Sequence, residues 1–149
     1  TILKGEMKMK KSVFKKAGSL LLVYMLCAVL LAGCSGQKLS ADFVEADVKT
    51  AAGNVISLIN NKDSDALLAL CTVKMKDALT QDVMEKIYEA IGEGGQFESI
   101  ESVSVGSQTD KASDEEFAVA VVKAKYEIKT FTFTISFTKQ MKLAGLYYR

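Results

Sequence analysis

The 149-residue chain contains no histidine, no proline and only three cysteines. Histidine is the most common general base in enzymes and the most common metal ligand, so its absence removes both roles at once. No catalytic constellation of other residues is present in the sequence. We therefore expect a protein that is not an enzyme and that holds no metal ion or cofactor. The absence of proline favours uninterrupted helices and strands.

A basic segment precedes a short apolar run near the start of the chain. Lysines cluster before an unbroken apolar stretch, Leu20 to Ala32. A basic segment, a short apolar segment and a small-residue cleavage site are typical of a secretory signal peptide. A transmembrane helix is the alternative, but it needs about 20 apolar residues, and only 16 residues lie between Lys16 and Gly33. The pattern predicts a signal peptide over residues 1–33 and a polar tether over residues 34–40.

The apolar run ends in Leu31-Ala32-Gly33-Cys34, which resembles the bacterial lipobox. The resemblance implies a lipoprotein, in which a dedicated signal peptidase cleaves before Cys34. This cysteine then carries a diacylglycerol thioether and an acylated amino group, for example with palmitate. One acyl chain alone gives only marginal membrane binding, so two or more are needed for stable anchoring. We therefore expect a lipid-anchored, extracellular protein at the extracytoplasmic face of the cell membrane.

The exported part has the size of one domain. Removal of the leader leaves 116 residues, enough to bury a core. The formal net charge of this part is −4, because the leader holds six of the nineteen Lys and Arg residues and one of the eighteen Asp and Glu residues. An acidic domain with scattered lysines argues against nucleic-acid binding, which needs a basic stripe. Cys27 leaves with the leader, so Cys71 stands apart in an apolar run and is predicted to be a small buried hydrophobe.

Three helices are predicted at the start of the domain, which spans residues 41–149. Apolar residues recur at helical spacing over about 41–60, 64–71 and 81–92. Ser40 or Asp42 is the expected N-cap of the first helix, and Thr80 is the expected N-cap of the third. Glycines beyond residue 91 end the third helix.

Four strands follow, because the apolar period changes to two after Gly95. They are predicted over about 97–105, 117–128, 129–138 and 142–148, with irregularities in the first strand and a bulge near Gly145 in the last. The third strand alternates strictly between an apolar row (Phe131, Phe133, Ile135 and Phe137) and a threonine-rich row (Thr130, Thr132, Thr134, Ser136 and Thr138). A tight turn at Ile128-Lys129 would place Ala124 opposite Phe133. The apolar row is predicted to pack on the first and third helices.

The order of elements resembles a known family. Helices, then Gly95-Gln96-Phe97, a long strand, a phenylalanine-rich strand and a closing Lys142-Leu143-Ala144-Gly145-Leu146 are similar to a bacterial domain family of unknown function. That family belongs to the nuclear-transport-factor-two-like (cystatin-like, SnoaL-like) superfamily. The expected fold class is α+β, with three N-terminal helices packed on a curved four-stranded antiparallel meander. The resemblance implies a cone-shaped cavity between helix and sheet. Enzymes of the superfamily place Asp and His pairs in this cavity. Because this chain has no histidine, the resemblance implies only the cavity here and not the catalytic pair.

Two functions follow from this fold class. The first is a binding module that holds a small apolar ligand or a peptide in a cavity between helices and sheet. Its candidate pocket-lining residues are Tyr88, Tyr126, Phe131, Phe133 and Tyr148. The tyrosines can also simply fill the core with their hydroxyls at the surface. The alternative function is a protein–protein interaction or homodimerisation module, which uses the outer sheet face at Phe117, Val119 and Val121 beside the threonine-rich row.

Overall fold

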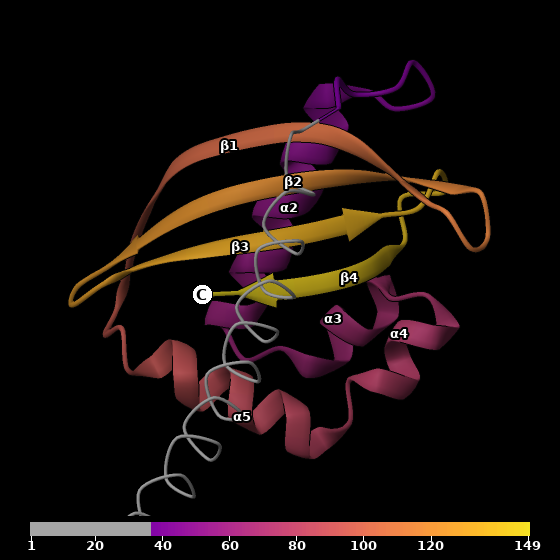
Figure 1. Cartoon of the computed structure of the whole chain (residues 1–149). Helices are drawn as coiled ribbons and strands as arrows, with labels where there is room; N and C mark the ends of the chain where they lie inside the picture. Colours follow the sequence, from indigo (N-terminus) through magenta and orange to yellow (C-terminus); the bar gives the residue numbers. More distant parts are fainter. Residues whose placement is uncertain (1–36) are drawn as a thin grey trace, which may run out of the picture. The chain divides into compact units, whose positions relative to one another are not determined.

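A computed structural model describes residues 37–149 of the chain (Figure 1). The predicted leader, with Cys27 and the predicted lipidation site Cys34, lies outside the described residues. At the start of the described part, the carbonyl of Gln37 accepts a hydrogen bond of 3.1 Å from the backbone N–H of Ser107. The N–H of Ser40 donates to the Ser107 hydroxyl at 2.7 Å. Residues 37–40 of the predicted tether are thus held against the strand that contains Ser107.

Four helices precede the sheet in the described part of the chain: α2 (Glu45–Asn60), α3 (Ser64–Leu70), α4 (Val73–Ala78) and α5 (Gln81–Gly92). The sequence predicted three, because α4 buries none of its residues and so shows no apolar periodicity. Thr72 begins α4 by accepting a hydrogen bond from the N–H of Met75 at 3.2 Å. Within residues 37–149, the helices are all too short or too polar to cross a membrane.

The predicted N-caps have different outcomes. The Thr80 hydroxyl accepts a hydrogen bond from the N–H of Val83 at 3.4 Å, which confirms the predicted start of α5. The predicted cap of the first helix is wrong. The N-cap residue of α2 is Val44, whose side chain makes no capping hydrogen bond. Asp42 instead forms an ion pair with Lys139, and so connects the segment before α2 to the turn that follows Phe137.

The sheet is the predicted antiparallel meander. It contains β1 (Phe97–Asp110), β2 (Glu115–Tyr126), β3 (Thr130–Phe137) and β4 (Leu143–Tyr148), in chain order. The first hairpin extends further than predicted, into the polar segment between β1 and β2. Pairing is irregular near the start of β1, and β4 bulges between Leu143 and Gly145, as the sequence predicted.

The register between β2 and β3 differs from the prediction by two residues. Val122 lies opposite Phe133, in place of the predicted Ala124. An even shift keeps every side chain on its predicted face. The hairpin loop is longer than a two-residue turn because its backbone forms hydrogen bonds with the segment between α5 and β1. The N–H of Glu127 donates to the carbonyl of Gln96 at 2.9 Å, and the N–H of Ile128 donates to the carbonyl of Gly94 at 2.8 Å.

One hydrophobic core lies between the sheet and the helices. The sheet curves around α2, which crosses behind it, while α3 and α4 lie beside β4 and α5 runs below them (Figure 1). The apolar row of β3 is buried as predicted, with Phe133 fully inaccessible. The threonine-rich row faces outward, except that Thr138 is buried and its hydroxyl accepts a hydrogen bond from the N–H of Lys142. The helices contribute Val48, Ala52, Val55, Ile56 and Ile59 from α2 and Met84, Ile87 and Ile91 from α5.

Candidate functional site

A hollow of about 250 Å³ lies where the C-terminal ends of α2 and α5 meet the start of β1 and the end of β2. We call it the inner hollow. Its walls combine three apolar side chains (Ile59, Ile91 and Phe97) with Asn60, Tyr88 and Tyr126, and its other lining residues are Lys62, Gly92, Gly95 and Gln96. It therefore lies between helices and sheet, where the resemblance implies a cavity.

Two of the residues that line the inner hollow are glycines near the end of α5. Gly95 has a φ of +79°, and a Cβ there would lie 2.9 Å from the Cβ of Glu127. An L side chain is therefore unfavourable at this position both for its backbone conformation and for lack of room. Gly92 has open space, because a Cβ there would meet no atom within 4 Å. Gly92 and Gly95 thus both line the hollow, and of the two only Gly92 has room for a side chain.

Besides the exposed Lys62 and Gln96, the polar side chains of the inner hollow carry two tyrosine hydroxyls and the Asn60 amide. The Tyr126 hydroxyl donates to Asn60 Oδ1 at 2.8 Å. Burial raises the pKa of Tyr126, so its hydroxyl stays protonated and remains a donor at neutral pH. The Tyr88 hydroxyl and the Ser64 hydroxyl lie 2.8 Å apart and share a hydrogen bond.

The amide nitrogen of Asn60 is the exception among these groups. Nδ2 is buried and has no hydrogen-bond partner among residues 37–149. A buried donor without a partner costs about 1–3 kcal/mol, because it loses its hydrogen bonds to water and gains none in return. An unsatisfied group of this kind is uncommon in a folded protein and calls for an explanation.

The structure brings two of the five candidate pocket-lining residues to the inner hollow, Tyr88 and Tyr126. Phe131 packs edge-on against Tyr126, with ring centroids 5.2 Å apart, and so supports the wall from behind. Phe133 is fully buried, and Tyr148 packs against it with centroids 6.4 Å apart. These last three residues fill the core and do not line the hollow.

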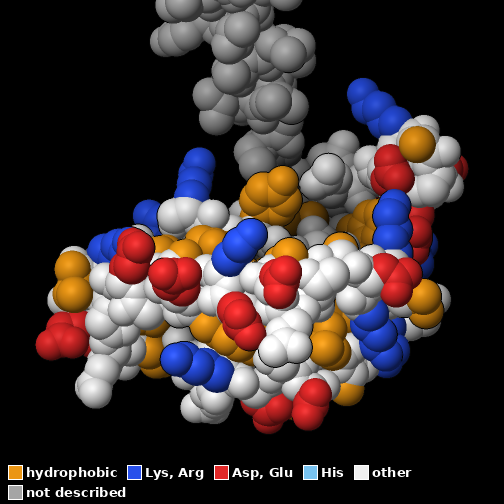
Figure 2. Space-filling view, turned by 90° about the horizontal axis from the view of Figure 1, so that it is seen from below, with side chains coloured by type: hydrophobic (Ala, Val, Ile, Leu, Met, Phe, Trp, Pro, Cys, Tyr) orange, Lys and Arg blue, Asp and Glu red, His pale blue; other side chains and the backbone are white. Residues whose placement is uncertain are grey.

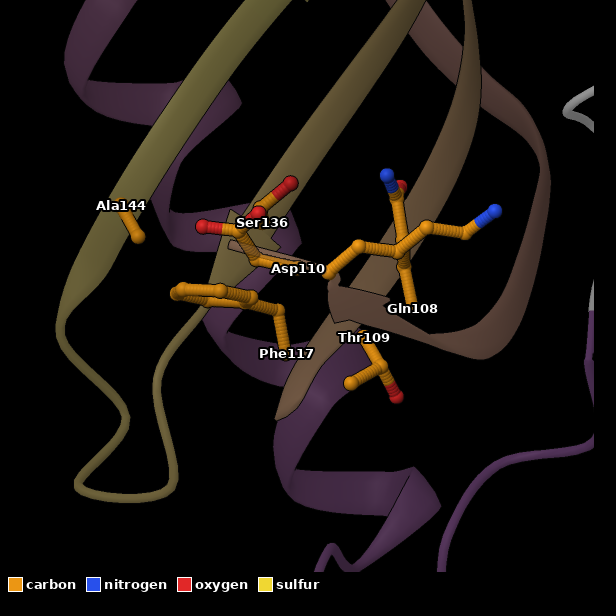
Figure 3. A pocket seen from close by; sticks show the side chains of 7 residues that line it. Gln108, Thr109, Asp110, Phe117, Ser136 and Ala144 are labelled. Carbon is orange, nitrogen blue, oxygen red and sulfur yellow. The ribbon is translucent and has the colours of Figure 1, made fainter. Parts of the chain in front are cut away.

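A second and more open hollow of about 470 Å³ lies on the outer sheet face (Figure 3). We call it the outer hollow. The ring of Phe117 lies on the side formed by Ser136 and Ala144, and Gln108 lies on the opposite side. The bulge of β4 presents only small side chains there, which leaves the ring half-exposed. Thr109, Asp110 and Lys111 complete the lining.

Asp110, the acidic residue in the outer hollow, is hydrogen-bonded within its own loop. The carboxylate of Asp110 accepts hydrogen bonds from the N–H of Ala112 at 3.0 Å and from the hydroxyl of Ser113 at 2.9 Å. These two bonds lower the pKa of Asp110. Its ionised form is thus stabilised by the turn between β1 and β2, which is a structural role.

Cys71 is buried at the end of α3, as the sequence predicted. Its thiol donates to the carbonyl of Leu67 at 3.3 Å. Burial raises the pKa of Cys71, although Lys76 and Lys142 oppose the shift. The reactive form of cysteine is the thiolate, so this thiol is poorly suited to act as a nucleophile at neutral pH. Among residues 37–149, no three Cys, Asp or Glu side chains are grouped closely enough to hold a metal ion.

Charges of both signs are interspersed over the face seen from below (Figure 2). Exposed ion pairs include Lys125 with Glu98 at 2.7 Å and Lys129 with Glu93 at 3.2 Å. Pairs of this kind contribute about 0–1 kcal/mol each in water. The interspersed charges on the face in Figure 2 and the exposed ion pairs both mean that opposite charges offset one another, which does not favour a partner of one strong charge.

Comparisons with known proteins agree with this architecture. Residues 52–146 match the family described as "Protein of unknown function (DUF3887)". A protein from Ruminococcus gnavus ATCC 29149, solved by NMR, has a TM-score of 0.67 and 16% sequence identity, over 75% of this chain and 96% of that chain. At this identity the likeness shows the fold alone. No curated protein matches the chain. Because the family match spans more than half of the sequence, the chain belongs to the DUF3887 family.

Proposed function

We propose that this protein is a non-catalytic binding module that holds a small apolar ligand in the inner hollow. The observation that carries the proposal is the lining of this hollow, in which apolar walls surround two tyrosine hydroxyls and one asparagine amide. Small-molecule sites usually have this composition, and most have volumes of about 300–1,000 Å³. A volume of about 250 Å³ favours a compact molecule, or a single side chain of a peptide.

The residue types around the inner hollow support a role in binding over a role in catalysis. Its lining contains one lysine and two tyrosines but no carboxylate. The sequence contains no histidine. Histidine and the carboxylates are the most common general acids and bases, and the lining contains neither.

Titration with toluene tests this proposal. The NMR signals of the Tyr88 and Tyr126 rings are expected to shift and to saturate, because toluene fits the apolar walls. Gly92→Leu places a side chain into the open space beside the hollow and is expected to weaken binding about tenfold or more, which corresponds to about 1.4 kcal/mol. Glu89→Leu is the matched control, because Glu89 is an exposed α5 residue outside the lining. Shifts that never saturate, or equal affinity in Gly92→Leu and the wild type, would contradict the proposal.

The outer hollow favours a second candidate function, a protein–protein interaction or homodimerisation module. Phe117, Val119 and Val121 are half-buried on the outer sheet face, and Tyr147 is 78% exposed beside them. Apolar side chains gathered on one exposed face are typical of interaction sites. A melting temperature that rises with protein concentration would favour this candidate, because association stabilises the folded state by mass action.

We further propose that the protein is a lipoprotein of the nuclear-transport-factor-two-like superfamily, anchored to the extracytoplasmic face of the cell membrane. The sheet that curves around α2 supports the superfamily assignment (Figure 1), as does the hollow where the ends of α2 and α5 meet β1 and β2. The lipobox-like segment Leu31–Cys34 supports the anchor.

Replacement of Cys34 tests the anchor directly. In cells fed an alkyne-tagged fatty acid, the wild-type protein is expected to take up the label and to fractionate with membranes. Cys34→Ala should abolish both properties, because the thioether has no other attachment point. Cys71→Ala is the matched control, since Cys71 is buried in the folded domain. A Cys34→Ala protein that still carries label and sediments with membranes would contradict the proposal.

A further inference from the structure

We propose that the ligand of the inner hollow carries a neutral carbonyl oxygen, as in a ketone, an ester or an amide, which accepts a hydrogen bond from Nδ2 of Asn60. This inference rests on the proposed function and adds the chemical class of the ligand. The observation behind it is the buried amide nitrogen that has no partner among residues 37–149.

In the structure the hydrogen bond of Oδ1 leaves the nitrogen as the available end of the amide. Oδ1 of Asn60 accepts a hydrogen bond from the Tyr126 hydroxyl, which is itself held by the edge-on packing of Phe97 and Phe131 around its ring. With Oδ1 engaged, the two N–H groups of Nδ2 are the donors that lack an acceptor. A ligand oxygen at this position would satisfy one of them and remove the cost of burying it.

The charge around the inner hollow decides between a neutral and an ionised oxygen. The buried polar groups of its lining, Asn60 and Tyr126, are both neutral. A buried carboxylate needs a charged partner to offset its desolvation, and a neutral carbonyl does not. Lys62 is exposed, and the carboxylate of Glu127 lies close to Gly95 and would repel an anion. A neutral carbonyl on a small apolar body therefore fits best.

The apolar walls indicate what the body of the ligand is, and the exposed rim indicates how it enters. Ile59, Ile91 and Phe97 offer hydrophobic contacts to a compact ring or a short chain. Nδ2 is closed to solvent, whereas the lining residues Lys62 and Gln96 are exposed. A ligand oxygen therefore reaches the amide only when the lining rearranges around Nδ2. The exposed Lys62 and Gln96 are the lining side chains that can move with the least loss of buried contacts.

Three probes that share one aromatic ring test the inference in the full chain. Toluene has no acceptor, acetophenone has a neutral carbonyl, and benzoate has an ionised carboxylate. Acetophenone is expected to bind about tenfold more tightly than toluene, because it satisfies a buried donor. It should also shift the side-chain amide signals of Asn60 in the ¹H–¹⁵N spectrum, which toluene should leave in place. Benzoate should bind more weakly than acetophenone.

Asn60→Leu provides the matched variant. It removes the donor at similar side-chain volume, so the preference for acetophenone over toluene should disappear, whatever the change does to the affinity for both probes. If acetophenone binds no more tightly than toluene and the Asn60 signals stay unmoved, the carbonyl inference is wrong and the proposed function stands. Tighter binding of benzoate than of acetophenone would also overturn the inference. If none of the probes saturates, the proposed function itself fails.

Discussion

Phe133→Ala is expected to lower the free energy of unfolding by about 3–5 kcal/mol, the usual range for truncating a buried phenylalanine. The Phe133 ring is fully buried, with Val122 opposite it on β2 and Tyr148 opposite it on β4. Its removal leaves a cavity at the centre of the sheet that neighbouring strands cannot close. Typical domains have a stability of only about 5–15 kcal/mol. In urea denaturation, the midpoint of the Phe133→Ala protein should therefore lie close to zero urea.

Thr132→Ala is the matched control for this prediction. Thr132 is the neighbour of Phe133 on β3, but it lies on the outer face and is half-exposed. Exposed substitutions of this kind usually change stability by less than about 0.5 kcal/mol. If Thr132→Ala destabilises the protein as much as Phe133→Ala, the outer face is buried in solution. A melt that depends on protein concentration would then identify homodimerisation as the cause.

Gly94→Ala is expected to destabilise the protein by about 1–3 kcal/mol, the typical cost of overpacking a core. The new Cβ would lie 2.6 Å from Cε2 of Phe131 and 3.1 Å from the carbonyl oxygen of Ile91. Phe131 is only 5% exposed, so its ring cannot move into solvent to make room. Displacement of Gly94 would also weaken the hydrogen bond that its carbonyl accepts from the N–H of Ile128. Thermal unfolding monitored by circular dichroism measures the loss.

Gly92→Ala is the control two residues away. A Cβ at Gly92 meets no atom within 4 Å, and Gly92 is the last residue of α5. Alanine at an unstrained helical position is more favourable than glycine by about 0.5–1 kcal/mol. We therefore expect this change to be neutral or stabilising. Equal destabilisation by both changes would mean that the corner beside the inner hollow is not packed as described.

Local patterns were enough to predict most of the fold. The strict alternation of β3 identified its buried face, and the out-of-step residues of β1 and the last strand predicted the irregular pairing and the bulge. The register of β2 with β3 was wrong, because the loop between them binds the backbone of Gly94 and Gln96, far away in sequence. α4 was missed because all of its side chains remain accessible and leave no apolar signal.

The candidate site was predicted only in part. Tyr88 and Tyr126 do line the inner hollow, whereas Phe133 and Tyr148 pack into the core. Asn60 was missed, because its place in the polar segment at the end of the first helix indicated only a turn. Its role depends on the Tyr126 hydroxyl, 66 residues away in the chain. Contacts of this range leave no local sequence pattern.

A crystal structure of the protein soaked in acetophenone would show directly whether the inner hollow binds a ligand. We expect density for the ring beside Tyr88 and Tyr126, between Ile59 and Ile91, with the carbonyl oxygen within hydrogen-bond distance of Asn60 Nδ2. An inner hollow without density, with the probe lying instead against Phe117 on the outer sheet face, would show that the inner hollow is not the binding site.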